Sequence, residues 1–237
     1  MTRRAILPLI ESLGDNCELG FYLEENRLNK GFLLRFAQVT PRSAVTFVRS
    51  PERNRFAFED LEPFSRTMVK DRATQIAFHT KMRSCRTPEG WCFETPEEER
   101  RAIYTEDKSK YDYLLERFES RLCSDEPRIY VIKSNEGLSD EDAQAMDEAL
   151  RLWKAPERFV LLAVNADPAV GTRRGKKAPP LDWRSDTVCH AQVAGFAPYS
   201  AAKNIDVPSW NRVFDALSGV GKVRGWLAEP DGSTLAA

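Results

Sequence analysis

Two apolar runs, separated by the pattern of an amphipathic helix, constrain the fold of this chain most strongly. Residues 128–134 and 159–164 are apolar along nearly their whole length, which is typical of strands covered on both faces. Between the runs, Ser139 precedes three acidic residues and an apolar repeat of three to four positions, the signature of a capped helix. The sequence therefore predicts a βαβ unit with a right-handed crossover.

The rest of the chain continues the alternation of strands and helices. This order predicts an α/β fold of three layers, in which a parallel-rich sheet has helices on both faces. We expect a single α/β domain over residues 1–237, with residues 168–182 as a basic, flexible insertion around Arg173–Lys177. Further strands are expected at residues 5–10, 31–37, 74–78 and 187–193, and further helices after residue 17, at 41–48, at 111–122 and at 210–217.

Charge and cysteine content narrow the class of protein. The chain has 35 Lys and Arg against 36 Asp and Glu, so its balance does not suggest a nucleic-acid partner. No apolar run approaches the roughly 20 residues of a membrane-spanning helix, so we expect no membrane partner. Five scattered cysteines make no disulfide framework, which favours the reducing cytoplasm. Their spacing fits no compact zinc signature, and we expect neither a metal nor a cofactor.

The stretch from Ser12 to Phe21 is the strongest candidate for chemistry. Gly14 allows a sharp turn after the apolar run 5–10, and Asp15 with Glu18 makes a capping-box pattern. With Asp15 as N-cap, Cys17 lies in the first helical turn, where free N–H groups and the helix dipole favour a thiolate. The alternative also stands, because most free cysteines are buried packing residues and the Asp15 carboxylate opposes thiolate formation.

Polar groups follow four of the expected strands. In open parallel sheets, ligands bind outside the carboxyl ends of the strands, so these groups are expected to converge. The simpler explanation is that turns need polar residues. Arg35, inside an apolar run, needs either an anionic substrate or an internal ion pair. The strand ends concerned are 14–17, 133–135, 165–167 and His79.

Only two histidines could serve as a general base for a cysteine nucleophile. His79 stands at a strand exit, which is a good position for a base. His190 follows Cys189 in an expected strand, with Asp186 four residues earlier. We favour His79.

The segment Ser12-Leu13-Gly14-Asp15-Asn16-Cys17 resembles the opening motif of an uncharacterised bacterial family described, by inference, as papain-like cysteine peptidases. Related domains accompany bacterial polysaccharide-synthesis and glycosyltransferase proteins. The resemblance implies Cys17 as nucleophile and His79 as base. The family usually has an acid directly after its histidine, whereas Thr80 stands here, so the third member of a triad stays open. The likeness covers most of the chain, through residues 33–37, 78–80, 111–118, 129–135, 159–164, 195–198 and Trp210.

Two functions are therefore weighed. The first is a cysteine-dependent hydrolase or acyl transferase, in which Cys17 attacks a carbonyl, His79 moves the proton and backbone N–H groups of residues 14–18 stabilise the oxyanion. The alternative is a non-catalytic or accessory domain that binds a sugar or nucleotide through the same turn and Arg35. A scaffold with a buried Cys17 is a third possibility. The partner would be a small molecule, a sugar or a peptide, and the oligomeric state is not indicated. The expected binding residues are Gly14, Asp15, Asn16, Arg35, Ser134 and Asn135.

Overall fold

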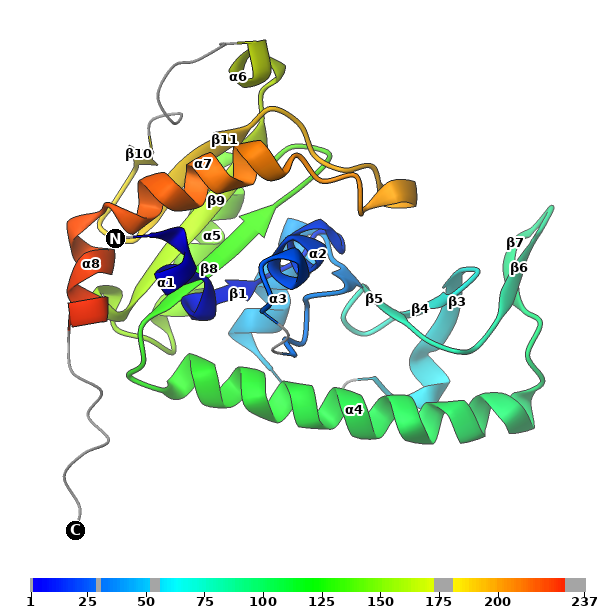
Figure 1. The fold of residues 1–237 in the computed structure, drawn as a ribbon. Helices are drawn as coiled ribbons and strands as arrows, with labels where there is room; N and C mark the ends of the chain where they lie inside the picture. The colour runs from blue at the N-terminus through cyan, green and yellow to red at the C-terminus, as the bar shows by residue number, and fades with distance from the viewer. Residues whose placement is uncertain (1, 29–30, 52–55, 173–180, 229–237) are drawn as a thin grey trace.

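The larger sheet of the computed structural model is parallel-rich, as predicted. The structure describes residues 2–28, 31–51, 56–172 and 181–228. Four strands run parallel, and β10 pairs antiparallel with β11 at one edge (Figure 1). The spatial order is β1 (Ile10–Ser12), β8 (Arg128–Lys133), β9 (Phe159–Ala166), β11 (Val188–Val193) and β10 (Asp182–Trp183).

Helices cover both faces of this sheet, which confirms the predicted α/β class. Alternate residues of β8 belong to different cores: Ile129 and Val131 pack on one side, Tyr130 and Ile132 on the other. This is why the strand is apolar throughout. One face is covered by α1 (Arg3–Ile6), α2 (Glu18–Glu25), α7 (Val207–Ser218) and α8 (Gly221–Ala228), and the other by α3 (Pro41–Arg49), α4 (Glu97–Cys123) and α5 (Asp140–Arg151).

The predicted strand–helix–strand unit is β8, α5 and β9. The two strands pair in parallel, with Ile129 opposite Val160. Ser139 caps α5 as predicted, because its side chain accepts from the N–H of Asp142 while the Asp142 carboxylate accepts from the N–H of Ser139.

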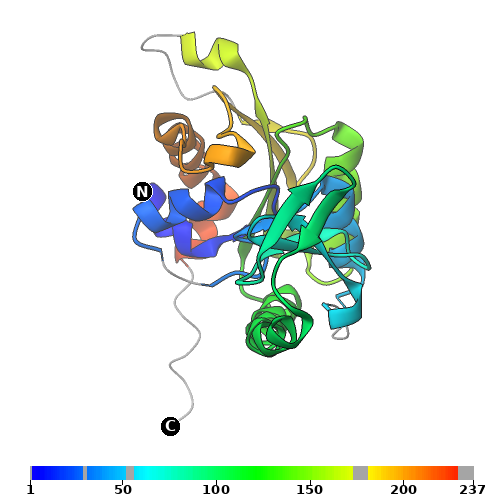
Figure 2. The ribbon, with the colours of Figure 1, turned by 90° about the vertical axis from the view of Figure 1, so that its right-hand side faces the viewer.

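A second, smaller antiparallel sheet lies beside the first (Figure 2). The two sheets share one apolar core, since Val69 and Ile76 belong to the same cluster of buried residues as Ile132 and Phe159. A separate hairpin and a short helix complete the described elements. The sheet has the order β2 (Ala37–Gln38), β5 (Ile76–His79), β4 (Met68–Asp71) and β3 (Leu61–Ser65), the hairpin is β6 (Ser84–Thr87) with β7 (Gly90–Phe93), and the helix is α6 (Pro168–Thr172).

Two strand predictions in the first forty residues are wrong in large part. Residues 5–10 are the end of α1 and a 3-10 turn over Leu7–Leu9, and pairing begins only at Ile10, because Pro8 cannot donate to a ladder. Residues 31–37 form turns up to Phe36, in which the N–H of Arg35 bonds the carbonyl of Phe32. Their apolar side chains are buried against helices instead of within a sheet.

Both described ends of the expected insertion at residues 168–182 contain regular secondary structure. Pro168–Thr172 form α6, and Asp182–Trp183 form the edge strand β10. The basic run Arg173–Lys177 lies outside the described residues.

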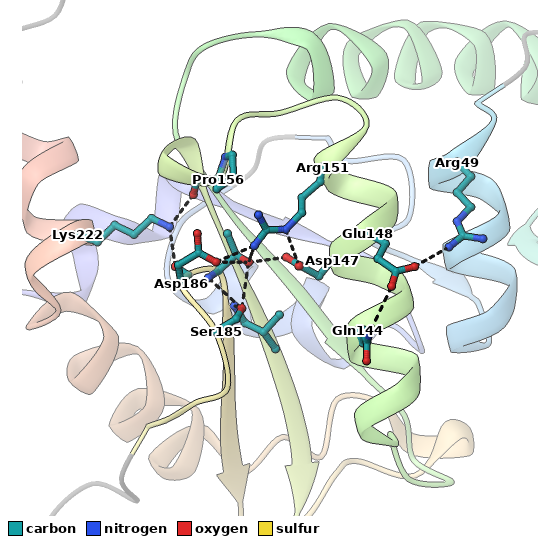
Figure 3. A network of polar contacts seen from close by, with 11 residues as sticks. Arg49, Gln144, Asp147, Glu148, Arg151, Pro156, Ser185, Asp186 and Lys222 are labelled. Carbon is teal, nitrogen blue, oxygen red and sulfur yellow. Dashed lines mark hydrogen bonds and ion pairs between the residues drawn. The ribbon is translucent and has the colours of Figure 1, made fainter.

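A polar network ties α5 to the amino-terminal ends of β9 and β11, away from the strand ends that were expected to form a site (Figure 3). Arg151 binds the carboxylates of Asp147 and Asp186, each at 2.7 Å. Lys222 donates to the backbone carbonyls of Asp186 and Pro156. Asp186 is therefore engaged by Arg151 and Lys222, and the network fixes the sheet without contributing to the candidate site.

Candidate active site

Cys17 and His79, the predicted nucleophile and base, lie next to each other. The Sγ atom of Cys17 is 3.5 Å from Nε2 of His79. Cys17 directly precedes α2, while His79 is the last residue of β5. The thiol is half-buried and the imidazole residue is exposed. A sulfur and a ring nitrogen at this separation are close enough to share a proton.

The reason for this meeting differs from the predicted one. The ends of β1 and β8 do lie together in the parallel sheet, but β5 belongs to the antiparallel sheet. The connection runs through β2, which pairs with β5, and through Val39, whose N–H donates to the carbonyl of Asp15 at 3.0 Å. His79 is thus brought to the turn by a seam between the two sheets.

Gly14 makes that seam possible. Its φ of +103° lies in the region that glycine favours, and a Cβ atom at this position would be 2.7 Å from Cβ of Val39. Any larger residue would push Val39 away from the turn. The predicted role of Gly14 in a sharp turn agrees with this geometry, and no contact with a ligand is needed to explain it.

The predicted capping box of Asp15 and Glu18 is wrong. Cys17 itself is the N-cap of α2, and the side-chain oxygen of Asn16 accepts the N–H of Glu18 at 2.9 Å. The Asp15 carboxylate faces the end of β8 instead, where it accepts from the N–H of Asn135 at 2.9 Å and from the hydroxyl of Tyr199 at 2.8 Å.

A buried cation lies directly beneath the turn. The side chain of Lys133, at the end of β8, is 0% exposed, and its Nζ lies 3.3 Å from Oε2 of Glu18 and 3.6 Å from Oδ2 of Asp15. It also donates to Oδ1 of Asn135 at 2.9 Å. Burial lowers the pKa of Lys133, while the two carboxylates raise it. Trp210 donates to the other Glu18 oxygen, at 2.9 Å.

The predicted polar binding residues largely bind one another. Asn16 and Asn135 both donate to the carbonyl of Ala197, at 3.3 and 2.8 Å. Ser134 is buried, and its hydroxyl accepts the N–H of Glu136 within its own turn. Asn16 and Asn135 thus hold the Cys17 turn through internal hydrogen bonds, whereas Ser134 stabilises the turn after β8.

Of the two predicted roles of Arg35, an anionic substrate or an internal ion pair, the structure shows the internal ion pair. Its guanidinium donates to the carbonyl of Gly20 at 2.9 Å and lies 3.8 Å from Oε1 of Glu24. Helix α2 approaches so closely that a Cβ on Gly20 would be 2.7 Å from the carbonyl oxygen of Arg35. The guanidinium joins α2 to the turn that follows it.

The expected thiolate at the helix start is not what the environment favours. Burial raises the pKa of Cys17 to about 11, although the charge of Lys133 acts in the opposite direction. Partial burial and the charge of Lys110 lower the pKa of His79, while a hydrogen bond to the Thr67 carbonyl raises it. At neutral pH the pair is therefore a thiol beside a neutral imidazole.

Thr80, which stands where the resembling family has an acid, is itself bonded to an acid. Its hydroxyl donates to Oδ2 of Asp107, on α4, at 2.6 Å. Partial burial raises the pKa of Asp107. A carboxylate is thus hydrogen-bonded to the residue that follows His79, a contact that the sequence alone did not indicate.

The second histidine has a different neighbour. Nδ1 of His190, on β11, lies 3.7 Å from Oδ1 of Asp140 at the start of α5.

Within the described residues, no group of three or more His, Cys, Asp and Glu side chains is arranged to hold a metal ion. None of the helices in the described ranges has both the length and the apolar character needed to cross a membrane.

Sequence reasoning included Lys133 among the converging strand ends without giving it a role, gave Glu18 only the capping role that is wrong, and missed Tyr199. Lys133 carried a usable signal, because a lysine that ends a wholly apolar strand needs a charged partner for the same reason as Arg35. Tyr199 and Glu18 carried none, since their partners lie far away in the sequence.

Comparisons with protein-family models, with curated proteins and with solved structures found no match to this chain. The resemblance to papain-like cysteine peptidases therefore stays a prediction. What the protein does has to be argued from the geometry of the turn, the imidazole and their surroundings.

Replacing Lys133 with methionine should destabilise the protein strongly. The change leaves the carboxylates of Asp15 and Glu18 buried without their cation, which typically costs about 3–5 kcal/mol of unfolding free energy. Urea denaturation measures the difference. Lys81→Met is the matched control, because this exposed lysine pairs with Glu106 at the surface, where solvent screens the charges, and its loss should leave stability nearly unchanged. Equal effects of the two changes would contradict the role of Lys133.

The alkylation rate of Cys17 should rise continuously with pH. Because its pKa is about 11, the thiolate fraction grows about tenfold per pH unit between pH 6 and 10. Iodoacetamide labelling followed by peptide mass spectrometry gives the rate, with the exposed Cys123 as internal reference. Cys17 should react more slowly than Cys123 at pH 7. A rate that is already at its plateau at pH 6 would show a stable thiolate–imidazolium pair and contradict the neutral pair.

Proposed function

We propose that the protein is a cysteine-dependent hydrolase or acyl transferase, with Cys17 as nucleophile and His79 as general base. The observation that carries the proposal is the 3.5 Å separation of Cys17 Sγ and His79 Nε2 at a strand-to-helix turn. Two residues 62 positions apart are brought together from different sheets, and both are accessible at least in part. A cysteine that serves only for packing has no need of an imidazole partner.

The neutral state of the pair determines the order of proton transfer. As Sγ forms a bond to the carbonyl carbon, His79 takes the thiol proton, so the nucleophile is activated only during attack. When the bond to the leaving group breaks, the same imidazole returns the proton to that group. Water completes a hydrolysis by attacking the acyl-cysteine, whereas another nucleophile in that step completes a transfer.

The backbone of the turn offers hydrogen-bond donors for the oxyanion. The N–H groups of Gly14 and Glu18 are engaged by the side chains of Ser12 and Asn16. In the part of the chain that the structure describes, the N–H groups of Asn16 and Cys17 have no acceptor. They are the donors that a tetrahedral intermediate on Cys17 would use.

The imidazole of His79 also interacts with the backbone carbonyl of Thr67. The Thr67 carbonyl accepts a hydrogen bond from the His79 ring, and the neighbouring Thr80 N–H donates to the same carbonyl at 3.0 Å. Because Asp107 holds the Thr80 side chain, α4 helps to fix the end of β5. In this proposal a backbone carbonyl takes the place of the acid in a triad.

The alternative, a domain that binds a sugar or nucleotide without chemistry, has weaker support. Anion binding at the turn needs available N–H groups and a free cation, but Arg35 is engaged by Glu24 and Gly20, and Lys133 by Asp15 and Glu18. The proposed substrate remains a small molecule, a sugar derivative or a peptide with a reactive carbonyl group. Five free cysteines agree with the reducing cytoplasm as its location.

Turnover of an activated ester should depend on both members of the pair. With p-nitrophenyl acetate, Cys17→Ala should abolish hydrolysis above background, and His79→Gln should lower kcat by about 10²–10⁴-fold. Activity should fall as the pH drops through the pKa of His79, which partial burial lowers from its ordinary value, because the protonated ring cannot accept the thiol proton. Mass spectrometry of a quenched reaction should find the acetyl group on Cys17.

The controls are His190→Gln and Cys123→Ser, which change the same residue types elsewhere and should leave turnover unchanged. Persistent hydrolysis by Cys17→Ala would refute the proposal. Stabilisation of the protein by a nucleotide sugar, retained in Cys17→Ser and without any ester turnover in the unchanged protein, would favour the binding alternative.

A further inference from the structure

A cavity of about 320 Å³ has His79 in its wall. It lies among α2, the turns that follow it, β5 and α4. Its volume is at the lower end of the roughly 300–1,000 Å³ typical of ligand pockets. A pocket that shares a wall with the proposed base is in a position to receive the part of the substrate next to the reacting carbonyl.

Cys17 itself does not line the cavity, and Glu24 is the one residue of α2 in its lining. Glu24 lines the cavity, and it is seven residues beyond Cys17, or about two helical turns on the same face. The axial distance that these residues span is roughly 10 Å. Gly20, which lies between them on α2, packs closely against Arg35 and Phe36. The route from Cys17 to the cavity therefore leads past His79, which contacts the thiol and lines the cavity.

The walls are mainly aromatic and are held by packing among themselves. The rings of Phe56 and Tyr111 stack with centroids 4.9 Å apart, and Phe78 meets Tyr111 edge-on at 5.3 Å. Phe36 is braced by Phe21 of α2 at 5.3 Å. The apolar part of the lining is thus held in place by its own packing, with Phe32 and Leu114 as further members.

The charges of the acidic and basic side chains that line the cavity sum to zero. Glu24 and Asp107 supply two negative charges, and Arg35 and Lys110 supply two positive ones. Arg35 already interacts with Glu24, and the charge of Lys110 lowers the pKa of Asp107. A charged ligand would lose its hydration in the cavity and would find no unpaired opposite charge there to compensate the loss.

We propose that this cavity is the acyl pocket of the enzyme and takes a neutral, apolar acyl group with an aromatic or branched end. The inference rests on the proposed function, since it names the substrate class of the same site. A phenyl ring on a chain of three carbons, counted from the carbonyl, suits the volume of the cavity and the aromatic rings in its walls.

Binding can be tested without catalysis. Cys17→Ala protein is titrated with 3-phenylpropanamide, a neutral probe, and with the charged 3-phenylpropanoate, by calorimetry or protein NMR. The amide should bind at least about tenfold more tightly than the carboxylate, because only the carboxylate must lose the hydration of a charge. Adding Leu114→Trp, which fills the cavity, should weaken amide binding by at least about tenfold.

Leu152→Trp is the matched control, because Leu152 is 66% exposed on the surface and does not line the cavity. Should Leu114→Trp fail to fold, Phe36→Ala removes an aromatic wall and should also weaken binding. Absent amide binding, or binding that neither variant alters, would overturn the acyl pocket.

Catalysis gives a separate readout. The unchanged protein should prefer p-nitrophenyl 3-phenylpropanoate over the acetate by at least about tenfold in kcat/KM, and Leu114→Trp should reduce this ratio. Equal kcat/KM values for the two esters would also overturn the acyl pocket. Amide binding without turnover of either ester would refute the proposed chemistry, while the cavity would stand as a site for neutral aromatic ligands.

A different observation concerns two other cysteines. Cys85 and Cys92 face each other across the hairpin of β6 and β7, and their sulfur atoms are 3.3 Å apart as free thiols. Cα atoms of directly opposed antiparallel residues are about 4.5–5.5 Å apart, within the range that a disulfide spans. Both residues are half-buried, so a small oxidant can reach them.

We infer that this pair is a reversible disulfide site whose oxidant is a low-molecular-weight disulfide such as oxidised glutathione. One thiolate attacks the glutathione disulfide, forms a mixed disulfide and releases one glutathione. The second thiolate then attacks the protein sulfur of that mixed disulfide and releases the other glutathione. The two thiol protons end on the two glutathione molecules, so two protein thiols are oxidised while one disulfide is reduced.

Equilibration with oxidised and reduced glutathione, followed by acid quenching and peptide mapping, tests this inference. The protein should lose two thiols and yield a linked Cys85–Cys92 peptide, and Cys123→Ser should behave identically. Cys85→Ser should leave Cys92 unlinked to any other protein thiol. The inference would be overturned by a disulfide to Cys123 or by a disulfide between two chains. It would also be overturned if Cys85 and Cys92 both remained thiols in fully oxidised glutathione.

Discussion

The buried ammonium group of Lys133 is the interaction on which the candidate site depends. A cation without exposed surface is tolerated only when carboxylates and hydrogen-bond acceptors surround it, and here Asp15 and Glu18 supply the charges. These two residues flank Asn16 and Cys17 in the sequence, so neutralising the cation at the end of β8 also fixes the turn between β1 and α2. The position of the thiol is thus a consequence of charge compensation in the sheet below it.

Burial also explains why Cys17 stays a thiol, although its position at the start of a helix alone would favour a thiolate. The helix dipole and Lys133 both favour negative charge at Cys17, but the loss of water outweighs them and raises the pKa to about 11. Lys133 is also largely satisfied by its own carboxylates, which leaves little of its field for the sulfur. A nucleophile in these surroundings needs a base during attack, and the lowered pKa of His79 keeps its imidazole in the neutral form that can accept the proton.

The sequence allowed the layers to be predicted better than the site. The βαβ unit followed from apolar runs and the Ser139 cap, because both are local signals. The strand predicted at residues 31–37 was largely wrong, because apolar turns buried between helices have the same composition as a strand. The meeting of Cys17 with His79 was predicted from shared strand ends, yet it arises from the contact of Val39 with Asp15 and the pairing of β2 with β5. Contacts between elements this distant leave no periodic trace in the sequence.

Because the pair spans two sheets, its geometry depends on how firmly those sheets are joined. The hydrogen bond from Val39 to Asp15 makes the joint, Gly14 allows it to close, and the shared core beneath α4 holds the antiparallel sheet in place. The aromatic cavity occupies the remaining space between α2 and α4, with Phe78 of β5 in its wall. Packing of Phe78 against Tyr111 therefore positions His79, its neighbour in β5, as well as lining the cavity.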